Sequence, residues 1–185
     1  MLSVKFEDLS EKDVLQLWEK GARTPGWPIE FSSLGNFQQY VFTNNFVLVF
    51  KNGFIKGIWV NDLLAGFTSL HEVGQEFFED GISVFEGGTF LLQSFRGFGL
   101  NETIKRYLLT SAFRIYNSTW CLFCIPVENK QAIRAIEKIN IPFERISNLD
   151  KHHPLYRYLK WKIWKIGKEF IFYGIELSSS IEMLK

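Results

Sequence analysis

Hydrophobic and polar positions along the chain follow two different periods, one typical of strands and the other typical of helices. Short segments that alternate, or that are apolar throughout, predict β-strands. We expect strands at residues 3–7, 46–50, 54–60, 63–70, 82–92, 119–125, 142–146, 156–166 and 170–177. Apolar residues that recur every three or four positions predict helices. We expect helices that begin near residues 10, 32, 100 and 128.

Capping and turn residues mark the ends of several of these elements. Ser10 is followed by acidic residues and predicts the N-cap of the first helix, which Gly21 is expected to end. The pair Asn61-Asp62 is typical of a tight turn. Residues 55–70 are therefore expected to form a β-hairpin.

Glycines interrupt two of the expected strand regions. Gly87-Gly88 lies inside residues 82–92 and predicts either a β-bulge or a close approach of another part of the chain. Gly167 lies between the last two expected strands, so we expect a closing hairpin around it.

Length, composition and charge narrow the class of protein. The 185 residues suit one domain, residues 1–185, and 46% of them are hydrophobic, which is ample for a core. The net charge of +1 implies no strongly charged partner. No apolar run approaches the ~20 residues of a membrane helix, and the N-terminus lacks the apolar core of a signal peptide. We therefore expect a cytoplasmic protein without a membrane span.

The cysteines do not predict a disulfide or a metal site. Cys121 and Cys124 are three positions apart on an expected strand, so their side chains should point to opposite faces. The three histidines are not spaced as ligands. We expect no metal, and two cysteines outside a disulfide framework suit a reducing compartment.

The segment 89–109 has the pattern strand, glycine turn, helix. The turn contains Gly97 and Gly99, and the helix that follows has Leu100, Ile104 and Leu108 on one face. A helix N-terminus presents unpaired N–H groups and a partial positive charge. Glycines let an anion approach those groups, so the turn is a candidate phosphate-binding loop. The alternative is a plain strand–helix connection whose glycines serve close packing.

The turn resembles the coenzyme A pyrophosphate loop of the GNAT acyltransferases, R/Q-x-x-G-x-G/A. Arg96-x-x-Gly99-x-Asn101 matches it except at Asn101, where the family has Gly or Ala. Asn tolerates a left-handed backbone, but its side chain can also crowd a phosphate. The resemblance implies that the preceding strand pairs with the pantetheine arm, which enters a gap between the fourth and fifth strands. It implies acetyl-CoA contacts from Leu91, Leu92, Arg96, Gly97, Phe98, Gly99, Leu100, Asn101 and Asn129.

A second segment resembles the RimJ/RimL-type N-acetyltransferases within that superfamily. Glu128-Asn129-x-x-Ala132-Ile133-Arg134 is similar to the subgroup's EN-x-x-S-I-R, and Ser111-Ala112-Phe113 stands where the subgroup often has Tyr-Ala-Phe. The resemblance covers residues 89–142. It implies one α/β (α+β) domain with a mixed, mostly antiparallel sheet of about six to seven strands flanked by helices. In this layout four aromatic residues either line an acceptor pocket or belong to the core: Trp27, Phe31, Phe37 and Tyr40.

Glu86 is the leading candidate for the general base, because in the family a carboxylate often takes the proton of the acceptor amine. The alternative is a solvated carboxylate at a strand edge. Four other acids in or beside the preceding loop are rivals: Glu72, Glu76, Glu79 and Asp80. The family also uses a strand-four N–H, here near Leu91 or Leu92, to polarise the thioester carbonyl.

The usual proton donors to the leaving group are missing. Many GNAT enzymes have a Tyr where this chain has Ile136, and the RimJ/RimL-type Ser is here Ala132. Either Tyr107 replaces them, or no donor is used, since a thiolate is a tolerable leaving group. A third possibility is that the protein is not an active acetyltransferase.

Residues 151–168 are basic and rich in aromatic side chains. They contain Lys151, Arg157, Lys160, Lys162, Lys165 and Lys168, interleaved with Tyr156, Tyr158, Trp161 and Trp164. Such a strip suits an acidic or nucleic-acid-bound partner. A half-buried strand with solvated lysines is the alternative.

Two functions from different classes follow. The first is an acyl-CoA-dependent N-acyltransferase that moves acetyl to the primary amine of a protein N-terminus or small molecule. The second is a catalytically inactive GNAT-like protein with a partner-binding or structural role. Arg96-Gly97-x-Gly99 favours the enzyme, whereas Asn101, Ala132 and Ile136 favour the inactive protein.

Overall fold

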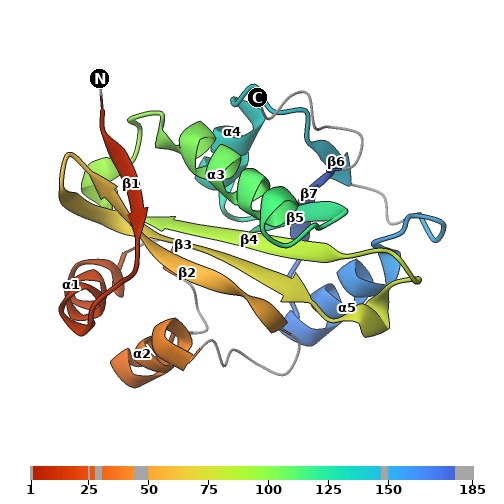
Figure 1. The fold of residues 1–185 in the computed structure, drawn as a ribbon, viewed down its shortest axis with the longest axis horizontal. Helices are drawn as coiled ribbons and strands as arrows, with labels where there is room; N and C mark the ends of the chain where they lie inside the picture. Colours follow the sequence, from red (N-terminus) through yellow and green to blue (C-terminus); the bar gives the residue numbers. More distant parts are fainter. Residues whose placement is uncertain (1, 25, 28–30, 44–49, 147–149, 178–185) are drawn as a thin grey trace.

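The structure, a computed structural model, describes all residues except 1, 25, 28–30, 44–49, 147–149 and 178–185. Its strands form one seven-stranded sheet in the order β1-β2-β3-β4-β5-β7-β6 (Figure 1). They are β1 (Val4–Glu7), β2 (Phe50–Val60), β3 (Leu63–Val73), β4 (Val84–Leu91), β5 (Trp120–Pro126), β6 (Glu144–Ile146) and β7 (Phe170–Glu176). The α-helices are α1 (Glu11–Gly21), α2 (Leu34–Thr43), α3 (Leu100–Arg114), α4 (Lys130–Glu137) and α5 (Tyr156–Ile166).

The sheet is mixed and mostly antiparallel, as expected. Among the strands that the structure describes, only β4 and β5 pair in parallel, and each of the other neighbouring pairs is antiparallel. The predicted hairpin is confirmed: β2 and β3 are joined by Asn61 and Asp62, whose φ angles of 49° and 64° suit a tight turn with left-handed residues. The expected strand at 46–50 lies largely outside the described residues.

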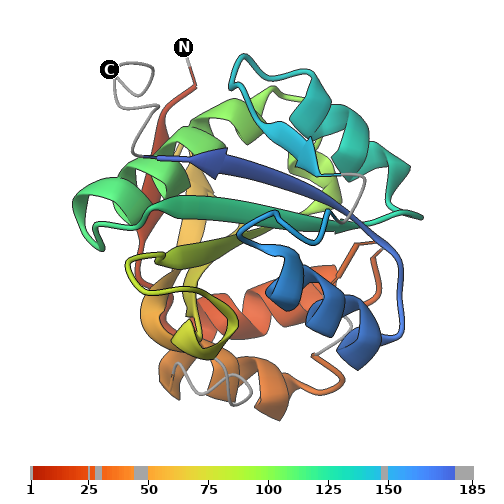
Figure 2. The ribbon, with the colours of Figure 1, turned by 90° about the vertical axis from the view of Figure 1, so that its right-hand side faces the viewer.

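The helices cover the two faces of the sheet (Figures 1 and 2). On one face, α3 and α4 pack on the strands through Ile104, Leu108 and Ile136. On the other face, α1 and α2 cover the β2–β4 half, and α5 covers the half that contains β5 and β7. Cys121 and Cys124 belong to opposite faces, as the strand period predicts.

Local capping explains where several helices begin. The Ser10 side chain accepts from the Asp13 N–H while the Asp13 carboxylate accepts from the Ser10 N–H, which is a capping box at α1. Ser33 accepts from the Asn36 N–H at the start of α2. The predicted helix starts near residues 10 and 32 are therefore confirmed.

The expected strand at 156–166 is wrong, because these residues form α5. Leu155, Tyr158, Leu159 and Lys162 are buried at a spacing of three and four positions, which is a helical face. The partner needed for a closing hairpin is also taken, since β7 already pairs with β5 and β6. Gly167 ends α5 with a φ of 68°, so it is a helix C-cap.

The paired glycines in β4 allow a close approach and do not form a bulge. The register of β3 and β4 is continuous from Glu72–Phe85 to Gly66–Leu91. A Cβ on Gly87 would lie 2.4 Å from the Phe123 ring and 3.2 Å from Leu108. Gly87 is thus required by the side chains of β5 and α3 that pack over it.

The four aromatic residues weighed as an acceptor pocket belong mainly to the core. Phe31, Phe37 and Tyr40 are buried, and the half-buried Trp27 packs edge-on against Phe37 with ring centroids 5.0 Å apart. The core alternative is therefore the correct one for the three buried rings.

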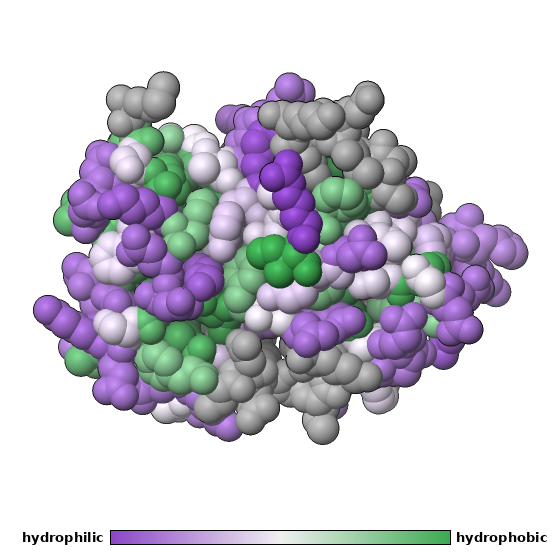
Figure 3. Space-filling model, in the orientation of Figure 1, coloured by the Kyte–Doolittle hydropathy of each residue, from purple (hydrophilic) through white to green (hydrophobic). Residues whose placement is uncertain are grey.

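In the described part of the chain, none of the helices is both long and apolar enough to cross a bilayer. Figure 3 shows hydrophilic residues over much of one face, interrupted by separate hydrophobic areas.

Substituting Gly87 by Ala tests the close approach in β4. The added methyl group overlaps the Phe123 ring, so we expect the free energy of unfolding to fall by about 1–3 kcal/mol. Gly35→Ala is the matched control, because Gly35 is exposed in α2 and its Cβ meets only Ser33 Oγ at 3.9 Å. That control should be neutral or stabilising by up to about 1 kcal/mol. Urea denaturation of both variants gives the comparison, and equal stability of the two would contradict this packing.

Candidate active site

An opening in the sheet lies between β4 and β5. The two strands pair only from Val84–Trp120 to Glu86–Leu122. Beyond Glu86, β4 stays paired with β3 as far as Leu91, while β5 stays paired with β7 as far as Pro126. The carboxyl ends of the two parallel strands therefore diverge, as the resemblance implies.

The glycine turn lies beside this opening, at the start of α3. Gly97 and Gly99 have φ angles of 86° and 73°, which favour glycine, and no atom lies within 4 Å of a Cβ built on either. Gly99 is the N-cap of α3 and supplies no side-chain hydrogen bond, so the first N–H groups of this 15-residue helix lack a side-chain cap. Phe98 is 60% exposed, whereas Leu100 is buried and anchors the helix start. The turn therefore has two left-handed glycines and a helix start without a side-chain cap, while anion binding stays a prediction.

Asn101 does not project into the turn. Its Nδ2 donates to the carbonyl oxygen of Ala135 in α4 at 2.9 Å, and its backbone belongs to α3. The side chain therefore ties α3 to α4 and leaves the glycine turn clear.

The other predicted cofactor residues have defined structural partners. Arg96 Nε donates to the Leu91 carbonyl at 2.9 Å, and its guanidinium lies 5.6 Å from the centre of the Phe90 ring. Burial lowers the pKa of Arg96. Leu91 is half-buried and packs on the α3 side. Leu92 faces the opposite core, and its N–H donates to Ala65, which leaves that N–H unavailable to a thioester.

Asn129 lies at the start of α4. Its Oδ1 accepts from the Ala132 N–H at 3.1 Å, which makes Asn129 the N-cap of that helix. Of the two positions where the resemblance implies a proton donor, Ala132 carries none and Ile136 is buried in the core. The structure therefore gives no replacement donor on α4 at these positions.

Glu86 lies on the opposite face of the sheet, where β4 and β5 begin to diverge. Its carboxylate accepts from the Tyr158 hydroxyl at 2.5 Å and forms an ion pair with Lys162, both from α5. His71 of β3 is directly opposite Glu86 in the register, and its Nε2 lies 2.5 Å from the Tyr40 hydroxyl. A buried polar cluster thus joins β3, β4, α2 and α5.

The electrostatics of this cluster keep Glu86 charged and His71 neutral. Burial alone would raise the pKa of Glu86, but the Lys162 ammonium and hydrogen bonds from Lys162, Tyr158 and Cys124 together hold that pKa below its ordinary value. Burial lowers the pKa of His71 to about 4. Burial and the Glu86 charge raise the pKa of both Tyr158 and Cys124.

Glu86 is therefore not a solvated carboxylate at a strand edge, which was the alternative to a general base in the sequence analysis. Sequence reasoning missed its partners because residues 156–166 were assigned to a strand. The spacing of Tyr158 and Lys162, four positions apart, was the available signal that both side chains share one helical face.

Tyr107 lies far from this cluster. Its ring stacks on Phe6 of β1 with centroids 3.9 Å apart, and Phe54 of β2 lies 5.6 Å away. Burial raises its pKa. Because β3 lies between these strands and β4, which carries Glu86, the structure does not bring Tyr107 together with Glu86.

The rival acids do not converge on the opening. Glu72 accepts a hydrogen bond from Asn52 at 2.5 Å, and the other three are exposed in the loop before β4: Glu76, Glu79 and Asp80.

Lys105 was not predicted from the sequence, although it lies in the opening. Its Nζ donates to the Thr89 hydroxyl at 3.1 Å and lies 4.2 Å from the centre of the Phe123 ring. The residue is 6% exposed, and burial lowers its pKa to about 8. Its charge comes from α3, on the face opposite Glu86.

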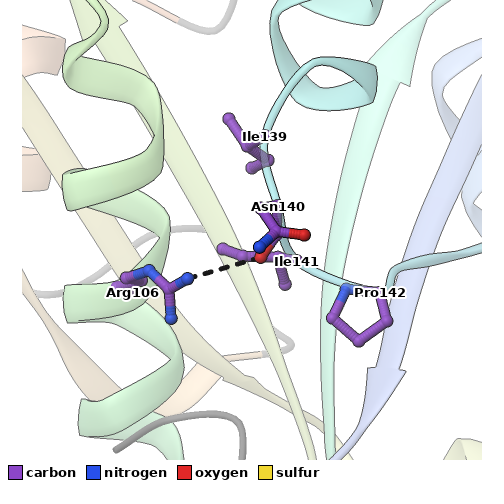
Figure 4. A pocket seen from close by; sticks show the side chains of 5 residues that line it. All are labelled: Arg106, Ile139, Asn140, Ile141 and Pro142. Atoms are coloured by element: carbon purple, nitrogen blue, oxygen red, sulfur yellow. Dashed lines mark hydrogen bonds between the residues drawn. The ribbon is translucent and has the colours of Figure 1, made fainter.

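A separate hollow of about 410 Å³ lies beside α3 (Figure 4). It is lined by Arg106 and residues 139–142, and Arg106 donates to the Asn140 carbonyl at its edge. None of the predicted site residues lines it, so it is distinct from the opening.

The Glu86–Lys162 pair can be tested by a double-mutant cycle. Glu86→Gln or Lys162→Met alone leaves a buried charge without this partner, so each should lower the free energy of unfolding by about 3–5 kcal/mol. The double variant should lose much less than the sum. Lys168→Met, which breaks the exposed pair with Glu128, is the control and should change stability little. Additive losses in urea denaturation would refute the pairing.

Comparison with known proteins identifies the fold. No family model and no curated protein sequence matches the chain. The aminoglycoside acetyltransferase AAC(6')-Ib, solved in complex with coenzyme A, matches with a TM-score of 0.70 and 18% identity, over 99% of this chain and 100% of that one. A probable acetyltransferase matches with a TM-score of 0.63 and 20% identity, over 95% and 94% of the two chains. The spermidine/spermine N-acetyltransferase SpeG from Vibrio cholerae matches with a TM-score of 0.60 and 16% identity, over the whole of both chains.

These similarities extend over nearly the full length of this chain and of each matched structure. They do not distinguish the RimJ/RimL-type subgroup, so that closer resemblance stays a prediction. The chain has the fold of the GNAT acetyltransferases.

Proposed function

We propose that the chain is an acyl-CoA-dependent N-acyltransferase that transfers acetyl to a primary amine. The observation that carries this proposal is the opening between β4 and β5, which lies beside the uncapped N-terminus of α3. The similar structures include a spermidine/spermine N-acetyltransferase and an aminoglycoside acetyltransferase. They support the reaction class but leave the acceptor open between a protein N-terminus and a small molecule.

The glycine turn would hold the pyrophosphate of acetyl-CoA. Backbone N–H groups of Gly97–Leu100 are the donors, and both glycines leave room for the anion. The Asn101 side chain is turned toward α4 and so does not crowd this position. Leu91 edges the opening along which the arm of the cofactor would run. When bound, acetyl-CoA supplies an activated acetyl thioester.

Glu86 is the residue we propose to receive the proton of the acceptor amine. It lies where β4 and β5 part, on the face away from α3, so an amine reaching the opening from that face meets it. Lys162 and Tyr158 keep it ionised but lower its basicity. Because each unit of pKa is a factor of ten in base strength, we expect slow proton removal.

The second candidate function is a catalytically inactive protein of the same fold. Two observations favour it: Glu86 is already paired with Lys162, and α4 offers neither usual proton donor at Ala132 or Ile136. Such a protein would retain the glycine turn and bind acetyl-CoA without turnover.

Binding of a partner at residues 151–168 stays a prediction, but fewer of these residues are exposed for it than the sequence suggests. The side chains of Tyr158 and Lys162 bond Glu86 inside the protein, so they are not available to a partner. Trp164 is 77% exposed, and Arg157, Lys160 and Lys165 are exposed cations of α5. An acidic partner would have to bind these outer residues.

Calorimetry with acetyl-CoA tests the proposal. We expect micromolar binding, on the order of −8 kcal/mol. Gly99→Val should abolish it, because a branched side chain is strained at a φ of 73° and fills the anion position. Gly167→Val is the matched control, since Gly167 has a φ of 68° at the end of α5, away from the turn. Absence of both heat and thermal shift with the unmodified protein would end the proposal.

Turnover separates the two candidate functions. The substrates are peptide N-termini, polyamines and small amines, and acetyl-CoA consumption is measured. Turnover that falls in Glu86→Gln supports the enzyme and the role of Glu86. Binding of acetyl-CoA without turnover on any amine favours the inactive protein.

A further inference from the structure

Lys105 is a cation buried inside the opening between β4 and β5. It is five residues beyond Leu100, which places it about 7.5 Å along α3 from the helix start. The ammonium spans the opening, because it donates to Thr89 of β4 and lies over the ring of Phe123 of β5. It is therefore deeper in the opening than the glycine turn.

In the described part of the chain, Lys105 has no carboxylate as a partner. Among the described residues, Lys105 forms no ion pair within 4.0 Å. The groups that face it are the Thr89 hydroxyl from β4, the Phe123 ring and the Cys121 thiol from β5. Glu86 is on the other face of the sheet, paired with Lys162. Burial of an ammonium without a carboxylate partner is unfavourable to folding, so negative charge on a ligand in the opening would stabilise it.

The ligand of the proposed function develops negative charge at one atom in this region. An arm that enters beside the α3 N-terminus and runs along β4 into the opening would pass Thr89, whose hydroxyl accepts from Lys105. The end of that arm is the thioester sulfur, which leaves as a thiolate.

We propose that Lys105 faces the sulfur of bound coenzyme A and is the proton donor to the departing thiolate. The inference rests on the proposed function and deepens it, because it supplies the donor that Ala132 and Ile136 lack. Lys105 lies on the α3 face, where the cofactor arm is expected, while Glu86 faces the acceptor from the opposite side.

The proposed step moves acetyl from sulfur to nitrogen and one proton from Lys105 to sulfur. The acceptor nitrogen forms a bond to the acetyl carbon, and the carbon–sulfur bond breaks with its electron pair on sulfur. Lys105 gives one proton to that sulfur, which yields the free thiol, and then regains a proton from water. The proton released by the acceptor amine passes to Glu86 or to water.

The pKa values of the Lys105 ammonium and of a thiol suit this proton transfer. Burial lowers the pKa of Lys105 to about 8, close to the ~8.5 of an ordinary thiol. Proton donors are most effective when their pKa lies near the working pH. An unperturbed lysine would hold its proton about two units more tightly.

The test measures the thiol pKa of coenzyme A bound to the full chain, from the ultraviolet absorbance of the thiolate during a pH titration. The two cysteines should not interfere, because burial raises the pKa of Cys121 to about 12 and that of Cys124 well above its ordinary value. The variants are Lys105→Met, which removes the charge at similar volume, and Lys105→Arg, which keeps the charge but does not release a proton. Arg106→Met is the matched control, because it removes the neighbouring α3 cation beside the separate hollow.

We expect the bound thiol to titrate at least about one pH unit lower in the unmodified protein than in Lys105→Met. Arg106→Met should behave as the unmodified protein does. Lys105→Arg should keep the low thiol pKa, while kcat falls roughly 10²–10⁴-fold in both Lys105 variants. KM for acetyl-CoA should change much less than kcat.

Two different failures can be told apart. If coenzyme A binds and Lys105→Met leaves the thiol pKa unchanged, this inference is overturned and the proposed function stands. If neither the unmodified protein nor Arg106→Met binds coenzyme A, both the inference and the proposed function are overturned.

Discussion

The rest of the structure depends on the way β4 and β5 part after three paired positions. The Phe123 ring occupies the space over Gly87 that a side chain would fill, and from there β4 follows β3 while β5 follows β7. Because the two strands are parallel, their carboxyl ends and the helices that follow them, α3 and α4, meet at one edge of the sheet. This single opening brings together the glycine turn, the Lys105 ammonium and, from the opposite face, Glu86.

Burial acts on the charged groups of the two faces in the same way, but with different results. Lys162 lies on the face covered by α5 and is paired with Glu86, whose carboxylate stays ionised. Lys105 lies on the face covered by α3, has a hydroxyl and an aromatic ring as neighbours, and its pKa is lowered to about 8. The first arrangement is complete within the protein. The second has no carboxylate partner among the described residues, and we propose that the sulfur of coenzyme A faces it.

Much of the fold could be predicted from the sequence, because local signals agree with the final structure. Ser10 caps α1, Asn61-Asp62 turns the hairpin and Gly99 begins α3, each within a few residues of its pattern. Residues 156–166 were misassigned because their aromatic content is typical of strands, although the spacing of Tyr158 and Lys162 also fits a helical face. The pairing of β7 with both β5 and β6 leaves no partner for the expected hairpin and decides for a helix.

The chemistry of the site was less predictable, for a related reason. Glu86 was found because the expected strand placed it beside the opening, but its partners come from α5, 72 and 76 positions further along. Lys105 falls on a polar position of a typical amphipathic pattern, and only the divergence of β4 and β5 makes that position buried. Tyr107 was chosen by residue type, and its stacking on Phe6 turns it toward β1.

The central claim is that the opening between β4 and β5 is the place where coenzyme A binds. A crystal structure of the full chain with coenzyme A tests it most directly. The account predicts that the pyrophosphate lies against the N–H groups of Gly97–Leu100 and that the sulfur lies beyond the Glu86–Leu122 pair, beside Lys105 Nζ and the Thr89 hydroxyl. Coenzyme A bound outside the sheet, with its sulfur away from Lys105, would contradict it.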